Sequence, residues 1–180
     1  ERQPASGLSL RGRTVPAFIA IEGPIGVGKT TLARKIAETF EYDLLLEEAE
    51  MNPFLERFYQ NREQTALATQ LFFLFQRVQK ITDIKQRDMF ESTRVTDFIL
   101  EKDPLFARVN LEPAEYALYD KVYEKMHVEA PAPDLVIYLQ ANPERLLERI
   151  GKRGIDAEQS IDRSYLEQLN EVYSEFFLYY

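Results

Sequence analysis

Residues 18–36 read FIAIEGPIGVGKTTLARKI, and this stretch decides the fold. Four apolar residues come first, a segment with three glycines, a lysine and two threonines follows, and an amphipathic stretch ends it. An apolar run without alternation is typical of a parallel strand that is covered on both faces, and the amphipathic stretch is typical of a helix. The sequence therefore predicts a strand and a helix joined by a turn with few large side chains.

The turn fits a known phosphate-binding pattern, because residues 23–30 match G-x-x-x-x-G-K-[ST], the P-loop. Its glycines let backbone N–H groups turn inward and approach a polyphosphate, and the following helix adds the positive end of its dipole. A plain glycine-rich turn is the alternative, but every position of the pattern is satisfied. We expect Lys29 to reach the β- and γ-phosphates of ATP and Thr30 to ligate Mg²⁺. The predicted nucleotide-binding residues are Gly23, Pro24, Ile25, Gly26, Val27, Gly28, Lys29, Thr30 and Thr31.

Length and composition limit the class of protein. A chain of 180 residues, 45% of them hydrophobic, can bury one substantial core. The absence of cysteine excludes disulfides and cysteine-based metal sites and favours a reducing, cytoplasmic setting. No apolar run reaches the ~18 residues of a membrane span. The net charge of −8 argues against a partner that is a nucleic-acid polymer, so positive charge for a nucleotide must be local.

The pattern along the chain predicts one domain. Residues 1–16 are polar and lack a hydrophobic period, so we expect a flexible tail or linker before a domain at 17–180. The chain ends in an apolar run, EFFLYY, where a helix is expected to lead into a further strand, so we expect the domain to lack its last strand.

Apolar runs alternate with helical patterns, which predicts an α/β fold with a parallel sheet of about four to five strands flanked by helices. We expect two helices between residues 52 and 87, broken near QNREQ. The expected strands are 17–22, 42–48, a run from 94 that ends near Asp97, and 133–141; the other expected helices are 30–40, 112–128, 143–153 and 162–179.

Five runs spread from Phe18 to about Phe177 stand out, namely IEGPIGVGKTT, LEEAEMNPFLERFY, ALATQLFFLFQR, DFILEKDPLFARVNL and YLQANPERLLERIGKRG. Together they resemble the deoxynucleoside kinase family, which includes the deoxycytidine, deoxyguanosine and deoxyadenosine kinases. The resemblance implies a P-loop kinase fold with an arginine-containing lid, and phosphorylation of a deoxynucleoside 5′-hydroxyl by ATP with Mg²⁺.

The family's general base is a carboxylate at the end of the second strand, and Glu47 occupies that place in the resemblance. A sugar hydroxyl is a poor nucleophile until a carboxylate orients it and accepts its proton. Glu48 and Glu50 are close rivals. An acidic strand end that is merely solvated is the alternative interpretation.

The long helical run offers groups that could read a base. Gln70 and Arg77 are seven residues apart, so both project from one face of a helix. The resemblance matches Gln70 to a glutamine that holds the base, and Arg77 and Asp103 to a pair used by deoxycytidine and deoxyguanosine kinases. This favours deoxycytidine, deoxyadenosine or deoxyguanosine over thymidine. Without the resemblance, a Gln and an Arg on a helix are more often surface residues.

The resemblance also implies residues around the sugar. Tyr59 matches the tyrosine that bonds the 3′-hydroxyl, and Glu158 lies where its carboxylate partner is expected. Phe106 is a candidate for stacking on the base, with a plain core residue as the equal alternative.

Residues 144–154, ERLLERIGKRG, resemble the family's lid, which closes cations over the transferring phosphoryl group. We expect Arg149 and Arg153 to act in catalysis, beside Arg145 and Lys152. The alternative is a solvated basic helix face.

Two positions depart from the family pattern. An arginine that meets the 5′-hydroxyl and phosphate is Phe98 here, and a further lid arginine is Ile155. Asp97 can still serve as the acidic group near Mg²⁺. The missing charge must come from Arg94 or a remaining lid arginine, or transition-state stabilisation is weaker.

Two further predictions concern His127 and assembly. His127 is the only histidine, and without a zinc spacing or an acid partner it is interpreted as a surface or helix-end residue. The resemblance implies a homodimer through helices, and the apolar run 67–75 is compatible with one, although it is equally compatible with a core helix.

Two other functions stay open. A nucleoside monophosphate kinase would share the P-loop but needs cations for the acceptor phosphate, and the group of Glu47, Gln70, Arg77 and Asp103 disfavours it. A regulatory module that binds nucleotide but turns over slowly is the other, because Phe98 and Ile155 replace cations.

Overall fold

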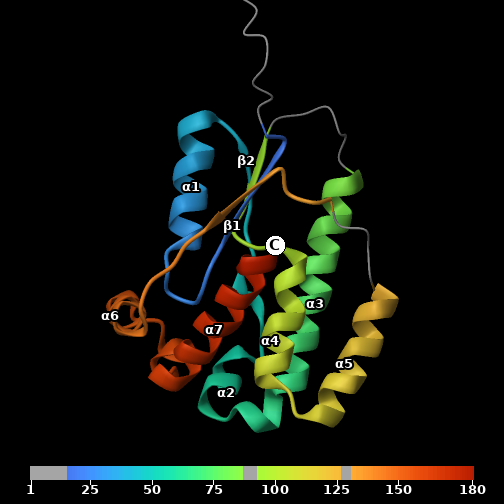
Figure 1. The fold of residues 1–180 in the computed structure, drawn as a ribbon, viewed down its shortest axis with the longest axis vertical. Coiled ribbons are helices and arrows are strands. Elements are labelled where there is room, and N and C mark those ends of the chain that lie inside the picture. Colours follow the sequence, from blue (N-terminus) through green and yellow to red (C-terminus); the bar gives the residue numbers. More distant parts are fainter. Residues whose placement is uncertain (1–15, 87–92, 127–130) are drawn as a thin grey trace, which may run out of the picture.

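A four-stranded parallel sheet forms the centre of the computed structural model, which describes residues 16–86, 93–126 and 131–180 (Figure 1). The strand order is β2-β3-β1-β4, and every neighbouring pair is parallel. The predicted α/β class is therefore confirmed. The strands are β1 (Phe18–Glu22), β2 (Asp43–Leu45), β3 (Arg94–Thr96) and β4 (Leu135–Tyr138).

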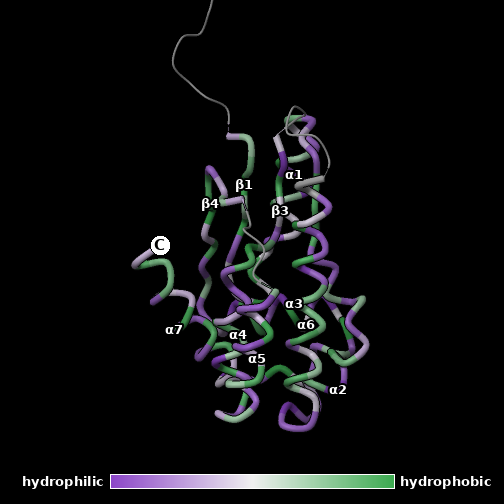
Figure 2. The backbone as a smooth tube through the Cα atoms, turned by 90° about the vertical axis from the view of Figure 1, so that its right-hand side faces the viewer, coloured by the Kyte–Doolittle hydropathy of each residue, from purple (hydrophilic) through white to green (hydrophobic). Residues whose placement is uncertain are grey.

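Helices flank the sheet, with α1 on one side of it and α3, α4 and α5 on the other (Figure 1). Figure 2 shows hydrophobic and hydrophilic residues alternating along the helices, as expected where one face is buried. The α-helices are α1 (Lys29–Phe40), α2 (Leu55–Gln60), α3 (Arg62–Gln86), α4 (Asp103–Asn110), α5 (Pro113–Met126), α6 (Pro143–Arg153) and α7 (Arg163–Tyr179). The short 3₁₀ turns among the described residues are η1 (Ala49–Met51), η2 (Leu100–Lys102) and η3 (Asp156–Ser160).

Two expectations about the elements need correction. The second strand is much shorter than predicted and ends at Leu45, so Glu47 lies in the segment after it. Helix α4 was not predicted, because a run of eight residues is too short to show a clear helical period. It begins at Asp103, with a proline in its first turn, where a missing N–H costs nothing.

The core consists of two clusters that meet at the sheet. One packs α1 against the strands and includes Ile19, Ala33 and Val95. The larger one lies among the helices and includes Leu74 of α3 and Leu166 of α7. No helix among the described residues is both long and apolar enough to cross a membrane. The predicted tail at 1–16 falls almost wholly outside the described residues, as does His127.

The register brings the carboxyl ends of the strands to one edge of the sheet. Ala20 of β1 pairs with Thr96 of β3, which in turn pairs with Leu45 of β2. The loops that follow these strands therefore lie together, and in parallel sheets such an edge is the usual place for a ligand. The fold positions the P-loop, Asp97 and Glu47 at this edge.

Arg94 lies at the opposite edge. It pairs with Phe18, the first residue of β1, and its guanidinium is 3.6 Å from Asp43 Oδ2. The expectation that Arg94 supplies the charge missing at Phe98 is therefore wrong.

We expect Gly23→Ala to lower the free energy of unfolding by about 1–3 kcal/mol, as overpacking does. A Cβ on Gly23 would lie 2.4 Å from the carbonyl oxygen of Leu139, and the φ of +147° is one that L residues rarely adopt. Urea denaturation measures the change. Gly151→Ala is the matched control, because a Cβ there meets nothing within 4 Å and alanine favours the helix. Equal destabilisation by both variants would contradict this packing argument.

Candidate active site

The P-loop forms a cup at the start of α1. Gly26 and Gly28 both have positive φ, and Gly28 caps the helix. The first N–H groups of a helix have no acceptor within it, so those of α1 are available to an anion. The backbone arrangement fits the phosphate chain of a nucleotide.

Lys29 folds back over this cup. Its Nζ donates to the carbonyl oxygens of Gly23, at 2.7 Å, and Pro24, at 3.2 Å. Burial, with the nearby charge of Lys102 as the next cause, lowers the pKa of Lys29 to about 8. An anionic ligand in the cup would offset both effects and would offer the ammonium better acceptors.

Thr30 and Asp97 bring two oxygens together beside the cup. Thr30 Oγ1 donates to Asp97 Oδ2 at 2.5 Å, and Asp97 Oδ1 accepts a hydrogen bond from the backbone N–H of Glu47 at 2.8 Å. A hydroxyl and a carboxylate fit Mg²⁺, which usually takes few protein ligands and completes its shell with phosphate and water oxygens. The described residues contain no group of three or more His, Cys, Asp or Glu side chains that could hold a metal alone.

A cavity of about 550 Å³ extends from the P-loop to α3 and α4. Asp103 lies just behind its wall, and Arg149 lies outside it, donating to the carbonyl oxygen of Val27 at 2.8 Å. The other predicted catalytic, metal and substrate residues all line the cavity, namely Lys29, Thr30, Glu47, Tyr59, Gln70, Arg77, Asp97, Phe106, Arg153 and Glu158.

Glu47 is the most enclosed of the three candidate carboxylates, with 15% of its side chain exposed. Its Oε1 accepts a hydrogen bond from Arg77 Nε at 2.7 Å, and its Oε2 accepts one from Lys102 Nζ at 3.0 Å. Burial alone would raise the pKa of Glu47, but Arg77 and then Lys102 outweigh it and lower the pKa to about 2. Glu48 and Glu50 are exposed, and Glu48 pairs with Lys80 at 2.5 Å.

Arg77 and Asp103 form a buried ion pair at the far end of the cavity. Asp103 is fully buried, its carboxylate also accepts a hydrogen bond from Tyr119, and its backbone oxygen accepts one from Gln70 Nε2 at 3.2 Å. Gln70 and Arg77 are buried too, so the surface interpretation is wrong for both. Burial would lower the pKa of Arg77, but Glu47 and Asp103 raise it above its usual value. The group presents amide and guanidinium donors to the cavity.

Aromatic side chains line the wall between these two ends. Phe106 contacts Tyr173 edge-on, with ring centroids 5.9 Å apart, and Phe73 lies under the guanidinium of Arg77 at 5.0 Å. Burial, followed by the charges of Tyr165 and Glu158, raises the pKa of Tyr59 well above its usual value. Phe106 is thus only partly a core residue, since it also faces the cavity.

The basic helix α6 distributes its cations over different faces. Arg153 pairs with Glu158 at the cavity, and Ile155 also lines it. Arg145 and Lys152 both pair with the exposed Glu148, each at 2.6 Å. Of the four cations predicted for the lid, only Arg149 and Arg153 lie against the P-loop or the cavity.

Sequence reasoning missed Lys102 and Glu22. Glu22 is fully buried at the end of β1, where its carboxylate accepts hydrogen bonds from Ile99 N at 2.9 Å and Tyr173 OH at 3.1 Å. Lys102 Nζ lies 3.5 Å from Glu22 Oε1. A charged residue ending an apolar strand was a usable signal for Glu22, whereas nothing in the sequence around Lys102 marked it.

Comparisons with known proteins point to one family. The family model "Deoxynucleoside kinase" matches residues 19–180. A deoxyguanosine kinase of Bacillus subtilis (strain 168) is 39% identical over 153 residues, which are 84% of this chain and 74% of the relative. A deoxyadenosine/deoxycytidine kinase of the same organism is 32% identical over 167 residues, 87% of this chain and 75% of the relative.

A solved structure also resembles this fold. It is a deoxyadenosine kinase from M. mycoides with bound dATP, with a TM-score of 0.80 and 30% sequence identity. The match covers 91% of this chain and 84% of that chain.

Proposed function

Because the chain belongs to the deoxynucleoside kinase family and is a phosphotransferase of that type, we propose that it transfers the γ-phosphoryl group of ATP to a deoxynucleoside 5′-hydroxyl. One observation carries the proposal. Glu47 lies on the wall of a single cavity that also contains Lys29 of the P-loop and the groups of Gln70 and Arg77. A sugar bound between those ends would present its hydroxyl to a carboxylate and to a phosphate together.

The P-loop residues 23–31 hold the phosphate chain through backbone N–H groups and the Lys29 ammonium. Thr30 and Asp97 would hold Mg²⁺ through the hydroxyl and carboxylate oxygens that are hydrogen-bonded to each other in this structure. When bound, Mg²⁺ neutralises charge between the β- and γ-phosphates. Arg149 and Arg153 of α6 add positive charge beside the loop and the cavity.

Glu47 acts as the general base. With a pKa near 2 the carboxylate is ionised at neutral pH and accepts a hydrogen bond from the hydroxyl, although it is a weak proton acceptor before reaction. The hydroxyl becomes acidic only as its oxygen bonds to phosphorus, so the proton moves late. Any ligand that draws Arg77 away from Glu47 strengthens this base.

Gln70, Arg77 and Asp103 read the base, and Phe106 supplies an aromatic face beside it. An arginine held by a buried aspartate suits a purine or an amino pyrimidine better than thymine, with its carbonyl and methyl groups. Relatives named for deoxyguanosine, deoxyadenosine and deoxycytidine support these three substrates. Tyr59 and Glu158 bind the sugar 3′-hydroxyl.

The test is a panel of four deoxynucleosides and four deoxynucleoside monophosphates with ATP and Mg²⁺. We expect deoxyadenosine, deoxyguanosine or deoxycytidine to be phosphorylated fastest and thymidine slowest. Phosphorylation of monophosphates alone would reject the proposal. Tight ATP binding without turnover would favour the regulatory module.

The lowered pKa of Lys29 predicts that ATP binding depends on pH. Since only its protonated form attracts phosphates, and its pKa in the free protein is about 8, ATP affinity should be constant below pH 8. Above pH 8 it should fall by about tenfold per pH unit. Calorimetry with Mg²⁺-ATP in buffers between about pH 7 and 9.5 measures this. Lys29→Arg keeps its charge and should lose the alkaline fall, and a fall of equal size in that variant would rule out Lys29 as its cause.

We also propose a homodimer, which the family resemblance implies. Phe75 lies in the apolar run of α3 and is half exposed. Analytical ultracentrifugation at micromolar concentration tests it, and a monomer there would reject it.

A further inference from the structure

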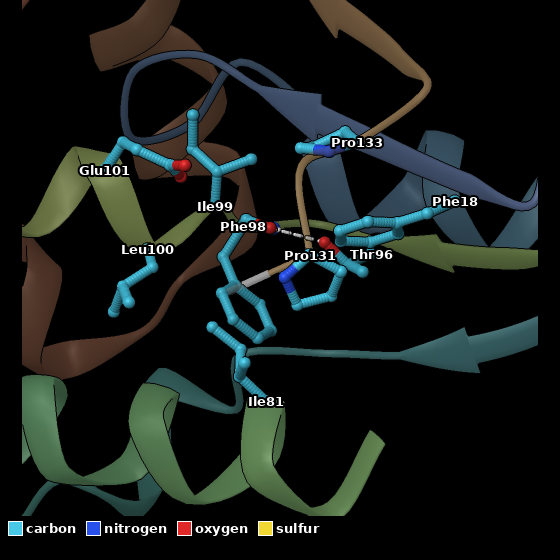
Figure 3. Close-up of a pocket in the computed structure, with 9 residues that line it drawn as sticks. All are labelled: Phe18, Ile81, Thr96, Phe98, Ile99, Leu100, Glu101, Pro131 and Pro133. Atoms are coloured by element: carbon cyan, nitrogen blue, oxygen red, sulfur yellow. Dashed lines mark hydrogen bonds between the residues drawn. The ribbon is translucent and has the colours of Figure 1, made fainter. Parts of the chain in front are cut away.

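Phe98 supplies no polar group to the cavity. Its side chain is 1% exposed and belongs to the helical core. Figure 3 shows its ring directed toward Ile81 of α3, beside a cavity of about 10 Å³ that is too small for more than a water molecule. The side chain at the position where the family carries an arginine therefore points into the core. A cation for the reacting oxygens must come from another residue.

Lys102 reaches that region from the end of η2, four residues later in the chain. It is 2% exposed, yet it lines the 550 Å³ cavity. Its Nζ donates to Glu47 Oε2 at 3.0 Å and lies 3.5 Å from Glu22 Oε1. A buried ammonium is stable only when it is paired, and these two carboxylates provide the pairing.

The position of the ammonium relative to Glu47 matters for chemistry. A hydroxyl that bonds to Glu47 shares the same carboxylate with Lys102, so its oxygen comes within reach of Nζ. Lys102 carries three N–H donors, and its hydrogen bonds among the described residues use one. The ammonium can therefore donate to a ligand oxygen while it stays paired.

We propose that Lys102 is a catalytic residue of the proposed phosphoryl transfer, on which this inference rests, and that its ammonium takes the place of the arginine missing at Phe98. Lys102 donates to the 5′-oxygen and to an equatorial oxygen of the γ-phosphoryl group. Lys29 stands on the P-loop side of the same group, so the two cations flank the developing charge.

The step balances without a further reactant. The 5′-oxygen forms a bond to the γ-phosphorus while the bond from that phosphorus to the β,γ-bridging oxygen breaks, and ADP leaves with the electron pair. The hydroxyl proton passes to Glu47. Lys102 exchanges no proton in this step and contributes only charge and hydrogen bonds.

A purely structural Lys102 is the competing explanation, since it also neutralises Glu22. That role would affect folding stability and leave the chemical step alone. The two explanations differ in kcat and in the binding of a transition-state analogue, while ground-state binding stays similar in both.

The experiment compares Lys102→Met, Lys102→Gln and Lys102→Arg with the parent, using the deoxynucleoside that the parent phosphorylates fastest. We expect Lys102→Met to lower kcat by about 10²–10³-fold, the range for loss of one such donor, with little change in either KM. The affinity for ADP, aluminium fluoride and deoxynucleoside together should fall by a similar factor. Lys102→Arg should recover at least about tenfold of the lost kcat, because it restores the charge.

Lys80→Met is the matched control. Lys80 is partly buried and, like Lys102, pairs with an acidic residue, at 2.5 Å from Glu48 Oε2, but it does not line the cavity. Its loss should leave kcat within about threefold. Thermal melts identify any Lys102 variant that does not fold, and Lys102→Gln, which keeps a hydrogen-bond donor, then takes the place of Lys102→Met.

The outcomes distinguish a failure of the role proposed for Lys102 from a failure of the proposed function. An active parent with a Lys102→Met or Lys102→Gln variant of near-parent kcat overturns the role of Lys102 and leaves the proposed function intact. Equal loss in Lys102→Met and Lys80→Met likewise overturns it. A parent that phosphorylates none of the four deoxynucleosides overturns the proposed function, and the inference fails with it.

Discussion

Glu47→Gln is expected to lower kcat by at least about 10²-fold, the lower limit for a positioned general base, while the affinity for ATP stays nearly unchanged. The amide keeps the size of the side chain and can still accept a hydrogen bond from Arg77 or Lys102, but it cannot take a proton. The hydrogen bonds of Lys29 go to the carbonyl oxygens of Gly23 and Pro24, so the change breaks no hydrogen bond of the P-loop lysine. Steady-state kinetics together with ATP titration measure the two effects.

Glu48→Gln is the comparison that identifies the base. Glu48 is next in sequence, but it is exposed and paired with Lys80, so its variant should keep most of the parent's turnover. If Glu47→Gln turned over at the parent's rate and Glu48→Gln did not, the base would be Glu48.

Arg77→Met is expected to lower the free energy of unfolding by about 3–5 kcal/mol, as the loss of one partner from a buried ion pair does. The change leaves the fully buried Asp103 without its cation and removes one of the two charges beside Glu47. Adding Asp103→Ala should recover part of the loss, because no uncompensated carboxylate then remains behind the wall. Urea denaturation of the two single variants and the pair gives the coupling between them.

The same double variant tests base recognition. Without the guanidinium and its aspartate, the cavity no longer favours amino and purine bases, so kcat/KM for thymidine relative to the best substrate should rise by at least about tenfold, or 1.4 kcal/mol. Arg163→Met is the control, since its ion pairs with Glu144 and Glu167 are exposed, and it should change neither the urea midpoint nor the preference. An Arg77→Met/Asp103→Ala variant with the parent's preference would remove these residues from base recognition.

Local sequence patterns were sufficient to predict much of the fold. The P-loop, the apolar strands and the long helix α3 each carry their own signal, and the seven-residue spacing correctly put Gln70 and Arg77 on one face. The short strand β2 was overestimated, since an apolar run does not show where hydrogen bonding to β3 stops. Helix α4 is too short for its period to stand out.

The residues of the candidate site were harder to predict from the sequence than the fold. The resemblance to a family indicated Glu47, Tyr59 and Asp103. It also implied an arginine at the position that Phe98 occupies in this chain. Lys102 could not be found in this way, because its place in the cavity depends on η2 turning it toward Glu22 and Glu47, both distant in sequence. In the sequence, only the charge of Arg94 makes it a candidate, and the strand register shows that it lies at the opposite edge of the sheet.

Arg77 bonds to Glu47 with one part of its guanidinium and to Asp103 with another, so it joins the two ends of the cavity. If a nucleobase engages the guanidinium, as we propose, it competes with Glu47 for Arg77 and raises the pKa of the carboxylate, which Arg77 lowers in the free protein. A substrate whose base engages Arg77 is therefore expected to be phosphorylated fast. A substrate whose base does not engage Arg77 is expected to bind but to react slowly. Nucleosides should then differ more in kcat than in binding affinity.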